Sequence, residues 1–164
     1  MAYFCFNNIR VAGVACAVPT NEVKTESYKH LFGDEEVEKF MEMTGVLASH
    51  RTSEHQTCSD LGFRAASELL EKKGINREEI GALIFSSHSP DYRRPSTAFV
   101  LQYRLGIPKE AVCYDISLGC SSLVVGMQTV ASIMNTSDMK YALLFVGDTA
   151  GKSVCSTDRS SAML

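Results

Sequence analysis

Apolar positions along the chain alternate between short runs that suit buried strands and wider spacings that suit amphipathic helices. The continuous runs at residues 82–85, 111–116 and 141–146 predict buried strands, and the apolar stretch 8–17, closed by Pro19, predicts an earlier one. The spacing over residues 60–73 and 121–135 predicts two helices with one apolar face each. We expect Ser59 to cap the first of these helices and Gly74 to end it.

Turn-forming residues and charges complete the pattern between these segments. Residues 22–43 are charged and helix-permissive, with a break near Gly33. Residues 90–95 form a loop between two prolines, after which Pro95 suits a helix start and Gly106 its end. Strands that alternate with helices indicate a layered α/β fold whose largely parallel sheet is covered on both faces.

Composition narrows the possible classes of function. The chain has 164 residues, of which 45% are hydrophobic and 21% charged, so we expect residues 1–164 to form one globular domain. The net charge of −3 argues against nucleic-acid or anionic-membrane binding, and no apolar run approaches the roughly 20 residues of a membrane helix.

The start lacks a basic region before an apolar core, and the six cysteines form no C-x-x-C pair, so we expect reduced thiols and a cytoplasmic location. The last residues, 162–164, open a new apolar segment, which favours a truncated chain.

Cys120 differs from the other cysteines because it lies between a predicted buried strand and a predicted helix. Free N–H groups and the dipole at a helix start favour a thiolate, which is the nucleophilic form of cysteine. The same N–H groups can hold the oxyanion of a tetrahedral acyl intermediate. Gly119 removes a side chain beside the sulfur, so a substrate can approach closely. Packing is the other interpretation of a single cysteine, and the sequence around Cys120 lacks the G-x-S-x-G pattern of a hydrolase.

The order of several short motifs resembles the N-terminal half of β-ketoacyl-acyl-carrier-protein synthase III, a family of the thiolase superfamily. The resemblance extends over the whole chain. It rests on the motifs at residues 9–13 and 18–20, T-G-V at 44–46, T-C-S-D-L at 57–61, P-D-Y-R-R-P-S-T-A at 90–98, L-G-I at 105–107, D-I at 115–116, G-C-S at 119–121 and T-D-R at 157–159.

This resemblance implies a fold and an activity. The fold is the thiolase-like α/β fold, of which this chain is the first of two pseudo-repeated halves. Cys120 is then the catalytic residue that accepts an acyl group from acyl-CoA or an acyl-carrier protein. The acyl group condenses with malonyl-acyl-carrier protein and yields a 3-oxoacyl product of fatty acid biosynthesis. The resemblance places Gly119, Ser121 and Arg159 at the substrate, and implies no cofactor, no metal and a two-fold homodimer.

The resemblance also implies that part of the catalytic machinery lies elsewhere. The family completes its site with a His and an Asn from the second half, beyond residue 164, so we expect the fragment alone to be inactive. None of His30, His50, His55 and His88 matches the family's catalytic histidine. A zinc site built from Glu54, His50, His55 and Cys58 is a weaker interpretation, because the spacing fits no common zinc motif.

Departures from the family pattern leave two alternatives open. Lys39 and Met43 stand where well-known members place, in this order, a Trp and an Arg that clamp the CoA adenine, and Arg94 replaces an apolar residue. These departures keep open a ketosynthase of specialised metabolism that takes its acyl group from a carrier protein. The second alternative is a non-catalytic partner subunit of the same fold, against which the presence of Cys120 argues.

Overall fold

The computed structural model describes residues 3–163, apart from the side chain of residue 160. Contacts within the chain divide it into two compact units. The first unit combines Met1–Ala17 with Cys58–Asp148, and the second combines Val18–Thr57 with Thr149–Leu164. Each unit has its own sheet, so each is described separately.

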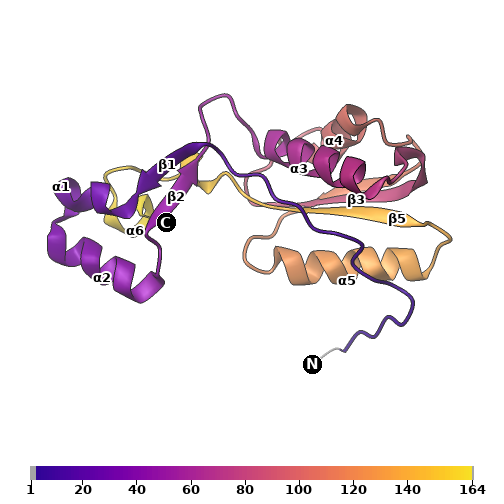
Figure 1. Ribbon diagram of the computed structural model, residues 1–164, viewed down its shortest axis with the longest axis horizontal. Coiled ribbons are helices and arrows are strands. Elements are labelled where there is room, and N and C mark those ends of the chain that lie inside the picture. The colour runs from indigo at the N-terminus through magenta and orange to yellow at the C-terminus, as the bar shows by residue number, and fades with distance from the viewer. Residues whose placement is uncertain (1–2, 164) are drawn as a thin grey trace. The chain divides into compact units, whose positions relative to one another are not determined.

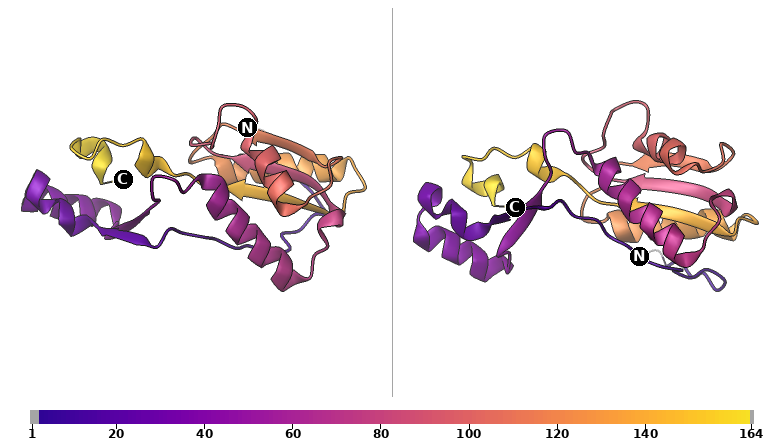
Figure 2. Two further views of the ribbon diagram at one scale, coloured as in Figure 1. Left: turned by 90° about the horizontal axis from the view of Figure 1, so that it is seen from above. Right: turned by 45° about the horizontal axis from the view of Figure 1, so that its top comes forward.

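A three-stranded parallel sheet forms the centre of the first unit. Strand β3 (Ile80–Ser86) lies between β4 (Val112–Ile116) and β5 (Tyr141–Val146) and pairs in parallel with both. Helices α3 (Cys58–Lys73) and α4 (Thr97–Leu105) cover one face and α5 (Ser122–Asn135) covers the other (Figure 1). The same layers are visible from two further directions in Figure 2. These elements confirm the expected α/β class with helices on both faces of a parallel sheet.

The register of the sheet determines where the loops meet. Ser86 at the end of β3 pairs with Ile116 on one side and with Val146 on the other. The carboxyl ends of the three strands therefore lie along one edge, where α/β folds bind their ligands. The short helix η2 (Arg77–Glu79) precedes β3 at the opposite edge.

The core of the first unit lies between the sheet and helices α3 and α4. Leu83 and Phe85 from β3 contribute completely buried side chains, and the rings of Phe85 and Phe145 lie 6.5 Å apart between centroids. Leu70 of α3 and Leu101 of α4 are buried in the same core and contribute the side chains of the helical layer. Burial of one such side chain stabilises a fold by roughly 1.5–3 kcal/mol, so this layer supplies the rigid base for the loops at the sheet edge.

Two predictions for the first unit are wrong. Residues 8–17 form no strand, because no strand among residues 3–163 pairs with them, and Val14 is 84% exposed. Helix α3 begins at Cys58 rather than Asp60, so Ser59 is a helical residue and not the cap. The Ser59 N–H instead donates to the Asp91 carboxylate at 3.1 Å, and this carboxylate comes from a distant loop.

Other boundaries agree with the sequence pattern. Strand β5 has the predicted limits, α5 begins one residue later than predicted, and Gly106 follows the last residue of α4. Not every apolar position of α5 is buried, since Leu123 and Val124 are 56% and 72% exposed. Among residues 3–163, no helix is both long and apolar enough to cross a membrane.

The second unit is smaller and pairs two short strands in antiparallel fashion. Strand β1 (Asn21–Lys24) pairs with β2 (Ala48–Arg51), so the predicted helical character begins only after residue 24. Three helical segments connect the two strands, namely η1 (Thr25–Tyr28), α1 (Lys29–Phe32) and α2 (Asp34–Thr44). Two more short helices of this unit come later in the chain, η3 (Ala150–Lys152) and α6 (Arg159–Ala162). The break at Gly33 is confirmed, because its φ of 87° lies in the region that favours glycine.

Candidate active site

Cys120 lies in the tight turn that connects β4 with α5, and its side chain is exposed. The N–H of Ser122 donates to the Gly119 carbonyl at 2.9 Å, and the N–H of Val125 donates to the Ser121 carbonyl at 3.0 Å. Ser121 therefore occupies the N-cap position, although its side chain makes no capping hydrogen bond. The turn presents the thiol beside the first turn of a helix, where backbone N–H groups lack helical acceptors.

Buried serines hold this turn against the central strand. The Ser86 hydroxyl at the end of β3 donates to the Ser122 hydroxyl at 2.9 Å, and both residues are at most 1% exposed. The Ser122 hydroxyl in turn donates to the Leu118 carbonyl at 2.6 Å. Since the hydroxyls of Ser86 and Ser122 are paired in the interior, the start of α5 has a fixed position relative to β3.

Asp148, the second residue after β5, organises the loop that follows β3. Its Oδ1 atom accepts hydrogen bonds from the Ser87 hydroxyl at 2.7 Å, from the His88 N–H at 2.7 Å, and from the N–H of Ser89 at 3.0 Å. The Ser87 N–H also donates to the Ile116 carbonyl at 3.1 Å. One carboxylate therefore joins the ends of two strands and fixes the backbone at residues 87–89.

Gly119 provides space for the imidazole of His88, a residue that matches no motif in the sequence. A Cβ atom on Gly119 would lie 2.8 Å from Nδ1 and 2.9 Å from Cε1 of His88. The imidazole thus fills the space next to the residue that precedes Cys120. A loop histidine directly after a predicted strand is the only signal in the sequence that could have indicated this contact.

The other predicted substrate residues lie in different surroundings. Gly119 and Ser121 flank Cys120 in the first unit, whereas Arg159 begins α6 in the second unit. The guanidinium of Arg159 pairs with the Glu36 carboxylate at 2.9 Å. Arg159 is therefore held within its own unit, and its role at a substrate stays a prediction.

Cys58 is the buried counterpart of Cys120 at the same edge of the sheet. Its thiol donates to the Gly147 carbonyl at 3.2 Å and only 6% of the residue is exposed. Burial raises the pKa of the Cys58 thiol from 9.0 to about 11, and the charge of Asp148 acts in the same direction. A neutral, enclosed thiol is a poor nucleophile, so Cys58 has a packing role.

Cys155 offers a second exposed thiol, in the second unit. A hydrogen bond with the Thr157 hydroxyl, at 3.2 Å, lowers the pKa of Cys155. The sequence pattern does not distinguish Cys155, because this residue follows no predicted strand and precedes no predicted helix. It provides the natural comparison for any reactivity assigned to Cys120.

A third carboxylate at this edge supports a neighbouring helix. Asp115 in β4 accepts the N–H groups of Thr97 at 2.7 Å and Ala98 at 2.8 Å, which are the first residues of α4. The negative charge complements the positive end of the helix dipole. Asp91, Asp115 and Asp148 therefore all bind backbone or hydroxyl donors near the strand ends.

The positions that depart from the family pattern are accessible to solvent. Lys39 and Met43 lie in α2 with exposed side chains, and Met43 is 77% exposed. Arg94 is exposed as well, so no buried charge arises there. Among residues 3–163, no three His, Cys, Asp or Glu side chains cluster as metal ligands.

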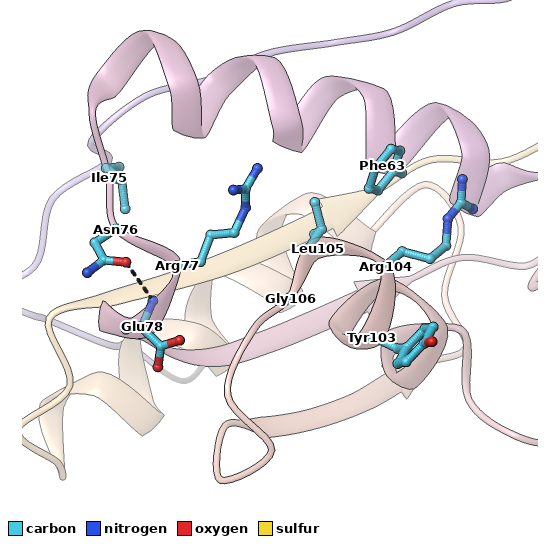
Figure 3. A pocket seen from close by; sticks show the side chains of 9 residues that line it. All are labelled: Phe63, Ile75, Asn76, Arg77, Glu78, Tyr103, Arg104, Leu105 and Gly106. Atoms are coloured by element: carbon cyan, nitrogen blue, oxygen red, sulfur yellow. Dashed lines mark hydrogen bonds between the residues drawn. The ribbon is translucent and has the colours of Figure 1, made fainter.

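An open pocket of about 610 Å³ lies in the first unit. Figure 3 shows the side chains that line it. It is lined by residues around η2 and the end of α4, including Arg77 and Tyr103. The Arg104 guanidinium lies 4.6 Å from the centre of the Phe63 ring and pairs with Asp60 at 2.8 Å. None of the predicted site residues lines this pocket, so we assign it no part in the chemistry of Cys120.

Comparison with known proteins identifies a consistent set of relatives. The profile of a family described as 3-oxoacyl-[acyl-carrier-protein (ACP)] synthase III matches residues 114–164, which include the Cys120 turn. The β-ketoacyl-[acyl-carrier-protein] synthase III of Clostridium beijerinckii is 32% identical over 158 residues, 96% of this chain and 48% of the relative. The enzyme of the same name from Latilactobacillus sakei is 34% identical over 155 residues, 94% of this chain and 46% of the relative.

Solved structures agree with the sequence relatives. The crystal structure of a 3-oxoacyl-(acyl-carrier protein) synthase from Burkholderia xenovorans matches with a TM-score of 0.91 and 36% identity, covering 94% of this chain and 44% of that protein. A second structure, of a 3-oxoacyl-(acyl-carrier-protein) synthase III, matches with a TM-score of 0.87 and 29% identity over 94% of this chain and 46% of that protein. This chain therefore spans about half the length of the relatives that it matches.

Proposed function

Because this chain belongs to the 3-oxoacyl-[acyl-carrier-protein] synthase III family, we propose that residues 1–164 are the N-terminal part of a condensing enzyme. Cys120 is its acyl-accepting nucleophile. The observation that carries this proposal is the exposed thiol in the β4–α5 turn, which the buried Ser86–Ser122 pair fixes beside a helix start. The relatives are β-ketoacyl-[acyl-carrier-protein] synthases III by name, and the matched family profile includes this turn.

The proposed reaction has two stages. The Cys120 thiolate attacks the carbonyl of an acyl thioester, and the departing thiol leaves an acyl group on the sulfur. Backbone N–H groups near the start of α5 stabilise the oxyanion that forms. Decarboxylation of malonyl-acyl-carrier protein then supplies the carbanion that takes the acyl group, which releases CO2 and yields a 3-oxoacyl thioester. The His and Asn that promote this second stage belong to the longer protein.

The acyl donor is either acyl-CoA or an acyl-carrier protein. The exposed Lys39 and Met43 offer no aromatic ring on which the adenine of CoA could stack, so the carrier protein is the favoured donor. The second candidate function is therefore a ketosynthase of specialised metabolism. We propose Gly119 and Ser121 as contacts of the acyl group, and Arg159 as a contact of the pantetheine arm. Six free cysteines suit a reducing cytoplasm, and the full protein is proposed to form a homodimer.

Intact-protein mass spectrometry of the full-length protein tests this proposal. Incubation with acyl-CoA, and separately with an acyl-carrier protein, adds one acyl mass to the wild type. The adduct disappears in Cys120→Ala and persists in the matched control Cys155→Ala. Absence of any adduct with both donors on the folded full-length protein contradicts the catalytic proposal and favours the non-catalytic partner subunit. Residues 1–164 alone are expected to form no 3-oxoacyl product from malonyl thioesters.

A further inference from the structure

We infer that Asp148 is a positioning residue for the nucleophile Cys120 and that it acts through the loop of His88. The inference rests on the proposed role of Cys120 and concerns the rate at which this thiol accepts an acyl group. Its basis is a series of contacts that leads from the end of β5, through the segment 87–89, to the turn between β4 and α5.

The position of Asp148 is set by the end of β5. The N–H of the preceding residue, Gly147, donates to the Ser86 carbonyl at 3.4 Å, so the backbone before Asp148 is joined to the end of β3. The Ser86 hydroxyl in turn bonds to Ser122 at the start of α5. Asp148 therefore follows a part of the sheet edge that is itself connected to the helix after Cys120.

A single oxygen of Asp148 binds the whole segment 87–89. Oδ1 accepts the Ser87 hydroxyl and the His88 N–H, both at 2.7 Å. The same atom accepts the N–H and the hydroxyl of Ser89 at 3.0 and 3.1 Å. Hydrogen bonds to an ionised acceptor are about twice as strong as bonds between neutral groups. Since all four donors converge on one charged atom, its removal releases three consecutive residues.

The segment 87–89 contacts the chain before the nucleophile at two points. The Ser87 N–H donates at 3.1 Å to the carbonyl of Ile116, the last residue of β4. The imidazole of His88 lies against Gly119, where a Cβ atom would be 2.8 Å from Nδ1 and 2.9 Å from Cε1. One contact therefore holds the start of the turn, and the other packs a ring on its last residue before the cysteine.

Gly119 needs such support because glycine has the largest conformational freedom of any residue. Its φ lies outside the left-handed range, so the space taken by the His88 ring, and not the backbone conformation, requires a glycine here. On the helix side, the N–H of Ser122 bonds to the Gly119 carbonyl and its hydroxyl bonds to the Leu118 carbonyl. The turn of Cys120 is thus held by α5 from one side and by the His88 loop from the other.

Small displacements of the sulfur have large effects on acyl transfer. The reacting atoms must approach to about 3–3.5 Å in one orientation, and a misplacement of about 1 Å can lower the rate about 100-fold. Loss of the Asp148 oxygen frees the His88 ring from Gly119 and widens the range of orientations of Cys120. The bonds that are lost are internal to the protein, so the affinity for the acyl donor is retained.

Single-turnover acylation of the full-length protein tests the inference. Intact-protein mass spectrometry follows the Cys120 adduct at several concentrations of acetyl-CoA, and separately of an acetyl-loaded acyl-carrier protein. We expect the limiting rate constant to fall at least about tenfold in Asp148→Ala and by a smaller factor in Asp148→Asn, which retains an acceptor oxygen. The half-saturating donor concentration should not change. Partial unfolding would instead lower the fraction of protein that is acylated.

The matched control is Asp91→Asn. Asp91 is a carboxylate at the same edge of the sheet, but it binds the Ser59 N–H at the start of α3. This variant should lose stability and keep the wild-type rate constant. Wild-type rate constants in both Asp148 variants overturn the inference.

His88→Ala tests whether Asp148 acts through the ring. This variant keeps the backbone N–H that bonds to Asp148 and removes the side chain that packs on Gly119. We expect it to slow acylation as much as Asp148→Ala does, and the double variant should show no further loss. Losses that multiply in the double variant would show that the two residues act independently and would overturn the inference.

Hydrogen–deuterium exchange provides a measurement that needs no acyl donor. Two N–H groups in residues 117–122, those of Leu118 and Ser122, bond to nearby carbonyls. We expect this segment to exchange about tenfold faster in Asp148→Asn and at the wild-type rate in Asp91→Asn. If the wild type accepts no acyl group while exchange rises in this way, the proposed function fails and the support of the turn by Asp148 stands. Unchanged exchange in this segment overturns the inference.

Discussion

Cys58 and Cys120 occupy similar places in the chain and very different surroundings. Cys58 is the first residue of α3, and Cys120 lies two residues before α5, so each thiol is close to the positive end of a helix. Cys58 is nevertheless buried, donates to the Gly147 carbonyl and has a pKa raised to about 11. Cys120 is exposed, and the His88 imidazole lies against the preceding residue, Gly119.

A position at the start of a helix therefore does not by itself make a cysteine reactive. A helix dipole contributes roughly 0.3–1 kcal/mol, which is less than one pKa unit. Burial of Cys58 opposes this contribution, and the nearby charges of Asp148 and Asp91 oppose it further. The environment of the side chain therefore decides which of the two thiols can act as a nucleophile.

The largest expected effect is a difference in alkylation rate between the two cysteines. At pH 8 a thiol with a pKa of about 11 is ionised in about one molecule in a thousand, and its burial slows the reagent further. We expect iodoacetamide to modify Cys120 at least about 100-fold faster than Cys58. Peptide mapping by mass spectrometry measures both rates, with the exposed Cys155 as a reference. Equal rates for Cys58 and Cys120 would remove the basis of the comparison.

Asp148→Asn tests the carboxylate that links both surroundings. The amide retains an acceptor oxygen but loses the charge that strengthens bonds to Ser87, His88 and Ser89, so we expect the free energy of unfolding to fall by about 1–3 kcal/mol. The pKa of Cys58 should fall as well, because a negative neighbour is removed. Urea unfolding and Cys58 alkylation measure the two effects. Asp138→Asn serves as the control, because Asp138 is exposed. An unchanged free energy of unfolding in Asp148→Asn would contradict the proposed role of the carboxylate.

Asp91→Ala removes the acceptor at the start of α3. The Ser59 N–H then loses its partner from the Asp91 carboxylate, and we expect the free energy of unfolding to fall by about 1 kcal/mol. Denaturant titration detects this change, with Asp138→Ala for comparison. A loss below the error of the titration would mean that water replaces the carboxylate without cost.

The smallest effect concerns alkaline stability. The folded pKa of Cys58 lies above its ordinary value of 9.0, so the folded state retains the proton at a pH where the unfolded chain releases it. This contribution is fully present below pH 9 and is lost as the pH rises toward about 11. Cys58→Ala should therefore lose less stability than the wild type between pH 8 and 10, by about 1 kcal/mol. Parallel slopes in urea unfolding across this range would show that Cys58 does not contribute.

The elements that the sequence predicted well are those specified by local pattern. Strand β5 and helix α5 follow from a continuous apolar run and a helical spacing, and neither depends on a distant residue. Residues 8–17 have an equally apolar pattern but form no strand, because a strand also needs a partner for its backbone.

The candidate site was predictable only in part. The position of Cys120 in a strand-to-helix turn followed from the neighbouring elements. The contact between His88 and Gly119, and the bonds of Asp148 to residues 87–89, join segments that are 30 to 60 positions apart in the sequence. Such contacts depend on the register of the sheet, which the pattern of a single sequence does not specify.

The hydroxyl pair between Ser86 and Ser122 has a consequence for motion. Because α5 is anchored to the central strand at its first residue, fluctuations of this helix should grow toward Asn135, where the described residues show no such hydroxyl pair. The turn that carries the sulfur then moves with the sheet rather than with the helix. A nucleophile mounted in this way keeps its alignment even while the remote end of its own helix frays.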